Sequence, residues 1–443
     1  MNTGLCFLMA AKRCEIAELA QLARTSELVN TTGRLVHALQ RERGLSNLYL
    51  AAADTPPAPH LQVALATQVE ESRAMEQALR QGFNELDTER LQRGHGARLF
   101  SRIAYVLHGL DALPRLRQLV AGRTWNAQQA TAAYVKLLAG LLSVVFEAAD
   151  SAHDPEVSRA LVALFNLMQG KEFAGQERAT GSALFAAGRA QATAQQHLLH
   201  LIDSQERCLQ VFSDFASPDV HALARQQENA HDLAELERLR RIVCTAPDGG
   251  ALDRTLSPTW FECCTRRMDE LRALEERLAQ NLETLCKTQM AAAQRELRAW
   301  EALQAAPHVA PDLVANPQGD FFETPSNGHH TPFGPLPQAV AQGGPAVSDR
   351  PQAPQVSRSV LELVHEQSQR LQAMAAELDT VRASLNERKL IERAKGLLMA
   401  HRQLGEDEAH KLLRQTAMAQ NRRIVDVAEA LLSMANVLPP TAR

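Results

Sequence analysis

The sequence predicts an all-α protein: a long-helix bundle, a flexible linker, and a short coiled coil that leads into a small three-helix module. Three observations support this fold class. The residues Ala, Leu, Gln, Glu and Arg dominate the chain, and aromatic residues make up only 4% of it, a composition that favours helix over strand. Apolar residues recur at helical spacing over stretches of roughly twenty to forty residues. No segment alternates apolar and polar side chains as a half-buried strand does.

Length, charge and cysteine usage limit the class of protein. The 443 residues leave room for two or three domains, and 45% of them are apolar. A net charge of -4 means that any basic function is local. Seven scattered cysteines without a CxxC pair favour a reducing compartment. No segment has the ~18 uninterrupted apolar residues of a membrane span, and Lys12-Arg13 follows the apolar start in the wrong order for a secretory signal. We expect a cytoplasmic protein without membrane contact.

The first region, predicted as one helical domain over residues 1–303, is divided by turn signals. Asn126 is a predicted N-cap, and Asp154 before Pro155 has the order of a cap followed by the first helical residue. Further helix breaks are expected in four segments: ADTPPAPH, QRGHGA, FASPDV and TAPDGGALDRTLSPTW. The helices between these breaks form the predicted bundle.

The composition changes sharply over residues 304–357, where Pro, Gly, Asn and Gln dominate. Such a segment cannot bury a core, so we predict a flexible linker. Structure is expected to resume over residues 358–438, beginning with a coiled coil. Its seam has a 3-4 spacing through Leu371, Met374, Leu378, Val381 and Leu385, with a weak extension to Leu361 and Val364. About two heptads are marginal alone, so they would help to pair two chains that are already held together elsewhere.

Three helices are predicted in the last segment, from LNERKLIERAKGLLM to NRRIVDVAEALL. The first continues from the coiled coil through Met399 and ends at Leu404-Gly405. The second begins with three acidic residues, and Asn421 caps the third. Their apolar faces are Ala409, Leu412, Leu413 and Ala417 in the second helix, and Ile424, Ala428, Leu431 and Ala435 in the third.

Basic side chains gather near the helix ends of this module, beside Met418: Arg388, Lys395, Arg414, Arg422 and Arg423. In a slightly acidic chain, such a local cluster indicates a nucleic-acid partner. A solvated basic face is the alternative, of about equal weight on charge alone. Gly396 favours the first interpretation. A glycine in mid-helix costs roughly 1 kcal/mol against alanine, and it predicts the close approach of another backbone.

The segments ERKLIERAKGLLM, GEDEAHKLLRQTAM and NRRIVDVAEALL resemble the three helices of the ANTAR domain. The resemblance implies a transcription antiterminator that binds paired hairpin loops of a leader RNA, with no DNA partner. The positions that match the motif or lie beside it give the predicted RNA-binding residues: Arg388, Lys395, Arg414, Met418, Arg422 and Arg423. Loop bases are splayed and readable, and Arg and Lys both hold phosphates, which suits this partner.

Three segments of the first region resemble, in order, signatures of the NIT domain, a helical sensor of nitrate and nitrite: LVHALQRERGLSNLYL, LMQGKEFAGQERATGSALFAAG and PTWFECCTRRMDELRALEERL. The resemblance implies nitrate or nitrite as the ligand and no cofactor. We predict that Arg43 and Arg178, each in a Glu-Arg pair on a separate helix, bind this anion, because a planar guanidinium can meet two of its oxygens. One of Arg238, Arg240 or Arg241 would complete the site, and the sequence does not choose between them.

Ion pairs are the alternative for both arginines. Salt bridges of Arg43 with Glu42 or another acid, and of Arg178 with Glu177, are favoured by roughly three to one when the resemblance is set aside, because such pairs are common. Gly44 and Gly175 suit a close helix approach around a small ligand, but a plain packing contact would use them too.

The order of the two domains is similar to that of nitrate-responsive antitermination regulators, which implies a dimeric one-component regulator of nitrate-assimilation genes. A long flexible linker cannot transmit a rigid push, so control by direct masking of the module is expected. The alternative is that the coiled coil and the sensor are coupled only through dimerisation. Two alternatives stay open: a helical adaptor or coiled-coil scaffold without RNA binding, and an ANTAR regulator that senses another small anion. We do not expect an enzyme, because the sequence has no paired carboxylates, no Ser/His/Asp arrangement, no phosphate-binding glycine loop and no metal-ligand spacing.

Overall fold

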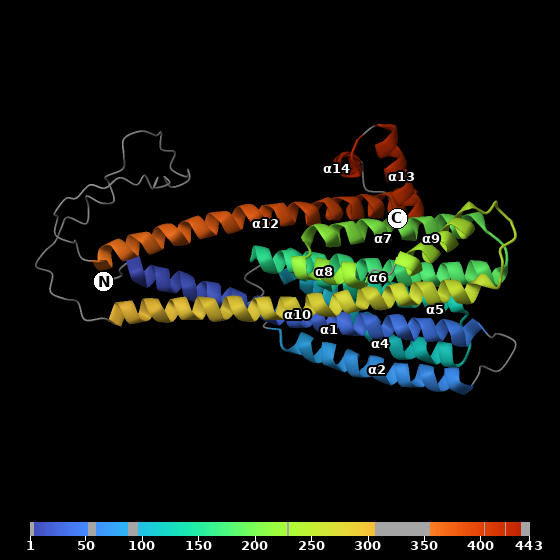
Figure 1. Ribbon diagram of the computed structural model, residues 1–443, viewed down its shortest axis with the longest axis horizontal. Coiled ribbons are helices and arrows are strands. Elements are labelled where there is room, and N and C mark those ends of the chain that lie inside the picture. The colour runs from blue at the N-terminus through green and yellow to red at the C-terminus, as the bar shows by residue number, and fades with distance from the viewer. Residues whose placement is uncertain are drawn as a thin grey trace, which may run out of the picture. The chain divides into compact units, whose positions relative to one another are not determined.

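The computed structural model describes residues 4–51, 59–86, 96–227, 230–305, 355–402, 404–420 and 422–435. In this part of the chain every regular element is a helix, which confirms the predicted fold class (Figure 1), and only an isolated bridge between Arg189 and Ala251 has β geometry. The helices are α1 (Gly4–Ala51), α2 (Pro59–Asn84), α4 (Gly96–Ala121), α5 (Ala127–Asp150), α6 (Pro155–Ala187), α7 (Ala192–Phe215), α8 (Pro218–Gln227), α9 (Ala230–Thr245), α10 (Leu256–Ala305), α12 (Gln355–Arg402), α13 (Glu406–Ala419) and α14 (Ile424–Ala435). Most of the predicted linker lies outside the described residues.

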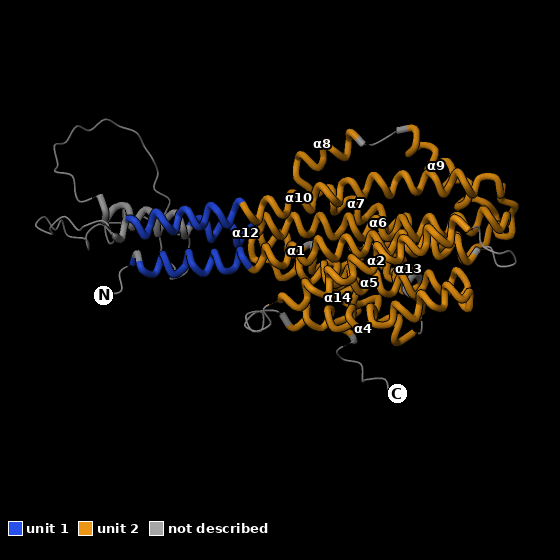
Figure 2. Tube along the Cα trace, turned by 90° about the horizontal axis from the view of Figure 1, so that it is seen from below, with its two compact units in different colours: residues 1–20, 288–377 blue, residues 21–287, 378–443 orange. Residues whose placement is uncertain are grey.

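Two compact units make up the chain (Figure 2): one of residues 1–20 and 288–377, the other of residues 21–287 and 378–443. In the smaller unit, Met9 and Trp300 form a small apolar core. The ammonium of the fully buried Lys12 lies 5.4 Å from the centroid of the Trp300 ring and 2.7 Å from a carboxylate oxygen of Glu296. The larger unit contains all the predicted site residues.

In the larger unit, α6 packs against both α5 and α7, and α4 packs against α5. Local signals start two of these helices as predicted. The Asn126 side chain accepts a hydrogen bond from the Gln129 amide, and Asp154 accepts one from the Val157 amide with Pro155 following it. Helix α5 is long and apolar enough to cross a membrane, but 61% of its most apolar window is buried inside the protein. It is therefore a core helix of the bundle.

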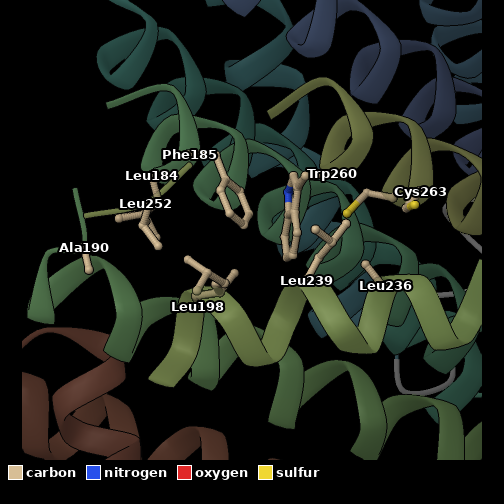
Figure 3. Packing of buried hydrophobic residues seen from close by; sticks show 11 residues of the cluster. Leu184, Phe185, Ala190, Leu198, Leu236, Leu239, Leu252, Trp260 and Cys263 are labelled. Atoms are coloured by element: carbon tan, nitrogen blue, oxygen red, sulfur yellow. The ribbon is translucent and has the colours of Figure 1, made fainter. Parts of the chain in front are cut away.

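A cluster of buried apolar residues from α6, α7, α9 and α10 packs around Trp260 and Phe185. Trp260 of α10 is fully buried and stands between Phe185 and Leu239 (Figure 3). The centroids of the Trp260 and Phe185 rings lie 5.7 Å apart. The indole Nε1 donates a hydrogen bond of 3.1 Å to the Arg178 carbonyl, so the cluster fixes the backbone of α6 beside a predicted site residue. Gly181 makes room for the indole, because a Cβ there would lie 2.1 Å from Trp260 Cε2.

Substitution of Gly181 by alanine is expected to lower the free energy of unfolding by about 1–3 kcal/mol, because the enclosed indole cannot move aside. Gly170→Ala is the matched control on the same helix. Its added Cβ would lie 3.5 Å from Cys208 Cβ, an ordinary contact, so the better helix propensity of alanine should dominate. Urea denaturation of both variants measures the difference. Equal shifts in the two variants would contradict the tight fit at Trp260.

The C-terminal part of the larger unit is a small helical module with its own core. The predicted apolar faces of α13 and α14 meet the end of α12 in a cluster that contains Ala394, Leu398, Ala409, Leu413, Ala417, Val427 and Ala428. The Gly405 amide caps α13 by donating to Glu408 Oε2 at 3.0 Å. Asn421, the predicted cap of the third helix, lies outside the described residues.

The expected coiled-coil seam lies on α12, and the structure buries much of it within one chain. Leu378, Val381 and Leu385 are 8%, 0% and 2% exposed, whereas Leu371 is 56% exposed. The buried residues are therefore already packed and do not present a free seam to a second chain in this arrangement. The coiled coil between two chains stays a prediction.

Candidate functional site

Arg43 lies in the seam between α1 and α6, where its side chain is 3% exposed. It pairs with the buried carboxylate of Glu172 on α6, through Nη1 to Oε1 at 2.5 Å and Nη2 to Oε2 at 3.2 Å. The amides of Gln40 and Gln176 donate to the same two oxygens at 2.8 and 2.9 Å. The ion-pair alternative therefore holds for Arg43, with Glu172 as the partner.

Glu42, the neighbour of Arg43, points to a different part of the bundle. Its carboxylate accepts two hydrogen bonds from Arg117 of α4, at 2.8 and 2.9 Å, and one from the Tyr134 hydroxyl of α5 at 2.8 Å. Successive residues of a helix point about 100° apart, which separates the two side chains. Together the two pairs hold α1 against α4, α5 and α6.

Arg178 lies in the same seam but has a different environment. Its Nη1 donates to Thr265 Oγ1 of α10 at 3.0 Å, and its guanidinium lies 4.7 Å from the centroid of the Phe261 ring. No carboxylate pairs with it in the described part of the chain. Burial lowers the pKa of Arg178, and the positive charge of Arg43 lowers it further, while Cys264 and Asp269 act in the opposite direction. Arg178 is thus a partly buried cation, and no ion pair with a carboxylate neutralises it among the described residues.

Two glycines admit the guanidiniums to the seam. A Cβ on Gly175 would lie 2.7 Å from Arg43 Nη2, and a Cβ on Gly44 would lie 3.2 Å from Arg178 Nη2. Each arginine therefore crosses the backbone of the opposite helix at a glycine. The structure brings Arg43 and Arg178 together, and the two glycines accommodate their side chains.

The structure separates the three arginines of LERLRRI from this pair. Arg240 binds Glu177 through two hydrogen bonds of 2.6 and 2.7 Å, and it also pairs with Glu237. Burial alone would lower the pKa of Arg240. The hydrogen bonds that Arg240 donates to the Glu177 carboxylate, and the charge of that carboxylate, outweigh burial and raise the pKa.

Of the other two, Arg238 is exposed and pairs with Glu235, and Arg241 is exposed. Among the described residues, no shared hydrogen-bond or ion-pair partner joins any of the three to Arg43 or Arg178. Which arginine completes the site stays a prediction.

Several residues that build the site were not singled out from the sequence. Glu172, Gln40 and Gln176 surround the Arg43 guanidinium, and Lys171 beside them forms a buried pair with Glu275 of α10. A usable signal exists, because Gln40 precedes Arg43 by three residues and Glu172 precedes Gly175 by three, a spacing that places each pair on one helix face. Which acid meets which arginine, however, depends on the packing of helices far apart in the sequence.

The predicted RNA-binding residues fall into two groups. In the first, side chains of the module contact the helical bundle. Arg388 Nη1 donates to Asn166 Oδ1 at 3.2 Å, and the Arg388 guanidinium lies 4.7 Å from the centroid of the Phe165 ring. Arg414 pairs with Asp203 of α7. Lys389, next to Arg388, pairs with Asp150 at the end of α5.

The remaining residues differ in exposure. Lys395 is buried and pairs with Glu392 at 2.9 Å. Met418 is 71% exposed, and Arg422 and Arg423 are exposed as well. The close backbone approach predicted at Gly396 does not occur within the described part of the chain, since nothing beyond its chain neighbours and the backbone of its own helix lies within 4 Å of a Cβ built there. That glycine faces open space.

Comparisons with known proteins match both halves of the chain. The family model described as nitrate and nitrite sensing (NIT) matches residues 34–283, and the ANTAR domain model matches residues 379–432. The nitrate regulatory protein of Klebsiella oxytoca is 32% identical over 424 residues, which cover 96% of this chain and 93% of that protein. The solved structure of the NasR transcription antiterminator aligns with a TM-score of 0.56 and 28% identity, over 98% of this chain and 99% of that one.

Proposed function

The chain belongs to the nitrate- and nitrite-sensing family with an ANTAR domain, and we propose that an anion bound by Arg43 and Arg178 controls its RNA-binding module. It is a nitrate- and nitrite-sensing transcription antiterminator, a regulatory RNA-binding protein and not an enzyme. The proposal concerns which residues sense the anion and how sensing reaches the RNA-binding residues.

One observation carries the proposal for the sensor: Arg178 is a partly buried guanidinium beside the buried Arg43, and no carboxylate of the described chain forms an ion pair with it. An uncompensated buried charge is costly. A nitrate or nitrite anion between the two arginines would remove that cost and accept hydrogen bonds from both. Since the arginines lie on α1 and α6, binding would change the packing of these two helices.

Titration calorimetry of the full chain with nitrate, nitrite and chloride tests this proposal. We expect saturable heat with nitrate or nitrite and none with chloride at the same concentration. Heat only with chloride or another small anion would favour the alternative of a different ligand. No heat with either nitrogen oxyanion would overturn the proposed sensing site.

The contacts of Arg388, Lys389 and Arg414 with the helical bundle support control by masking. Acidic side chains and an aromatic ring of the bundle contact these three residues of the module. Two of the three, Arg388 and Arg414, are residues that we assign to RNA binding. We propose that anion binding weakens these contacts and frees the module for paired hairpin loops of a leader RNA upstream of nitrate-assimilation genes. The anion can shift the population only if it binds the released state more tightly.

Arg422 and Arg423 are exposed, so we assign them to direct RNA contact. Replacing either by alanine is expected to weaken RNA binding and to reduce the slope of log K against log salt by about 0.7 for each phosphate that is no longer neutralised. Filter binding over a range of salt concentrations measures both quantities. Arg73→Ala, which removes an exposed positive charge from α2, is the control and should leave the slope unchanged. An unchanged slope in the module variants would remove these residues from the interface.

We also propose that the protein is a homodimer and that it is located in the cytoplasm. A homodimer fits the seam spacing of α12 and the family resemblance, and analytical ultracentrifugation tests it. All seven cysteines are free, four of them buried, which suits the reducing cytoplasm. A scaffold without RNA binding is disfavoured by the ANTAR match.

A further inference from the structure

We propose that Glu172 sets the charge of the anion that the sensor accepts, and so restricts it to monovalent anions. The inference rests on the proposed sensing site at Arg43 and Arg178 and deepens it. Neither arginine alone explains why a singly charged nitrogen oxyanion should be preferred to a doubly charged oxyanion such as sulfate. The carboxylate that pairs with Arg43 supplies a reason.

The charges around the seam are compensated locally, with one exception. Glu42 is matched by Arg117, Glu177 by Arg240, and Lys171 by Glu275, each through a direct ion pair. The exception among the described residues is the group formed by Arg43, Arg178 and Glu172. Within this group, two positive charges and one negative charge leave a net charge of +1, and Asp269 acts on Arg178 from outside the group without an ion pair among the described residues.

A buried site favours the ligand that brings its net charge to zero, because uncompensated charge is costly at low dielectric. A monovalent anion beside Arg178 neutralises this group. A divalent anion would leave one buried negative charge, close to the Glu172 carboxylate. Asp269, whose field also reaches Arg178, would add to that repulsion.

The hydrogen bonds of Glu172 hold this carboxylate in place. Its two oxygens accept four hydrogen bonds, two from Arg43 and one each from Gln40 and Gln176. Glu172 is also 2% exposed, so solvent screens its charge little. The carboxylate is thus a fixed negative charge that any anion in the seam must meet.

Glu172→Gln tests the proposal, because it removes the charge and keeps the shape. Calorimetric titration of the full chain with nitrate and with sulfate, at constant ionic strength, compares the two anions. We expect the wild-type protein to bind nitrate and to give no heat with sulfate. Glu172→Gln should bind sulfate, and it should bind nitrate at least about tenfold more tightly, since one like charge within a few ångströms is gone.

Glu172→Asp is the matched control. It shortens the side chain but keeps the charge, so it should still reject sulfate even if its nitrate affinity falls. If Glu172→Gln unfolds without an anion, thermal unfolding in nitrate and in sulfate replaces the titration, with Arg178→Ala as the correction for general salt effects. We then expect Glu172→Gln to be rescued by both anions.

Three results would overturn the role of Glu172: rejection of sulfate by Glu172→Gln while it still binds nitrate, acceptance of sulfate by the wild-type protein, or acceptance of sulfate by Glu172→Asp. A wild-type protein that binds neither nitrate nor nitrite is a different outcome. It removes the proposed sensing site itself and, with it, the inference.

Discussion

Replacing Arg178 by alanine is expected to abolish nitrate binding without lowering the free energy of unfolding. Replacing Arg43 by alanine should abolish binding as well, but it should also lower that free energy by about 3–5 kcal/mol. The two arginines bind the same ligand, so a binding assay alone does not distinguish them. Their effects on stability differ because their partners differ.

The difference follows from Glu172. Removing Arg43 leaves a buried carboxylate with only the amides of Gln40 and Gln176 as donors, and an uncompensated buried charge is strongly destabilising. Removing Arg178 leaves no carboxylate behind, only the Thr265 hydroxyl and the Phe261 ring. It also relieves the repulsion between the two guanidiniums that lowers the pKa of Arg178.

Urea denaturation in nitrate-free buffer, together with titration calorimetry, measures both effects. The double variant Arg43→Ala, Glu172→Gln is the control. It removes the orphaned charge and should recover a large part of the stability without restoring binding. Equal destabilisation by Arg43→Ala and Arg178→Ala would contradict the assignment of Glu172 to Arg43. Nitrate binding that survives in either single variant would place the anion elsewhere.

The double variant Asp150→Asn, Asp203→Asn is expected to raise the RNA affinity of the protein about tenfold in the absence of nitrate. Asp150 pairs with Lys389 and Asp203 with Arg414, and both acids belong to the bundle that contacts the module. The Arg414 pair is largely exposed and the Lys389 pair is partly buried, so each contributes no more than about 1 kcal/mol. Loss of both pairs would therefore raise the ratio of unmasked to masked protein roughly tenfold.

The affinity at saturating nitrate separates masking from a direct effect on RNA. If nitrate releases the module, the double variant and the wild-type protein should then bind RNA equally. Asp219→Asn serves as the control, because Asp219 pairs with Arg277 within the bundle and is not paired with the module. An affinity without nitrate that equals the wild-type value would show that these two pairs do not hold the module back.

Much of the fold was accessible from the sequence because its signals are local. Helical periodicity, the caps at Asn126 and Asp154, and the apolar faces of α13 and α14 each depend on residues within a few turns. The proximity of Arg43 and Arg178 was also predicted, through family motifs. The ion-pair partners were not predicted. Arg43 pairs with Glu172, which lies 129 positions away in the sequence, and Glu177 pairs with Arg240, which lies 63 positions away. Such contacts are decided by helix packing and leave no periodic trace.

Neither a mid-helix glycine nor the seam spacing of α12 identifies a packing partner. Gly396 was expected to allow a close backbone approach, but a mid-helix glycine signals only the absence of a side chain, and the space beside it is open. The seam on α12 had the spacing of a two-chain coiled coil, and the same spacing also suits a helix that buries Val381 and Leu385 within its own chain. Spacing identifies the buried face of a helix and leaves its partner open.

We propose that an anion at Arg43 and Arg178 releases the RNA-binding module, and RNA binding measured with and without nitrate tests this release. The measurement uses the full chain and an RNA with two adjacent hairpins from the leader of the nitrate-assimilation genes. We predict that saturating nitrate raises the affinity for this RNA in the wild-type protein and has no effect in Arg178→Ala. Equal RNA affinity with and without nitrate, in a wild-type protein that calorimetry shows to bind the anion, would contradict the account.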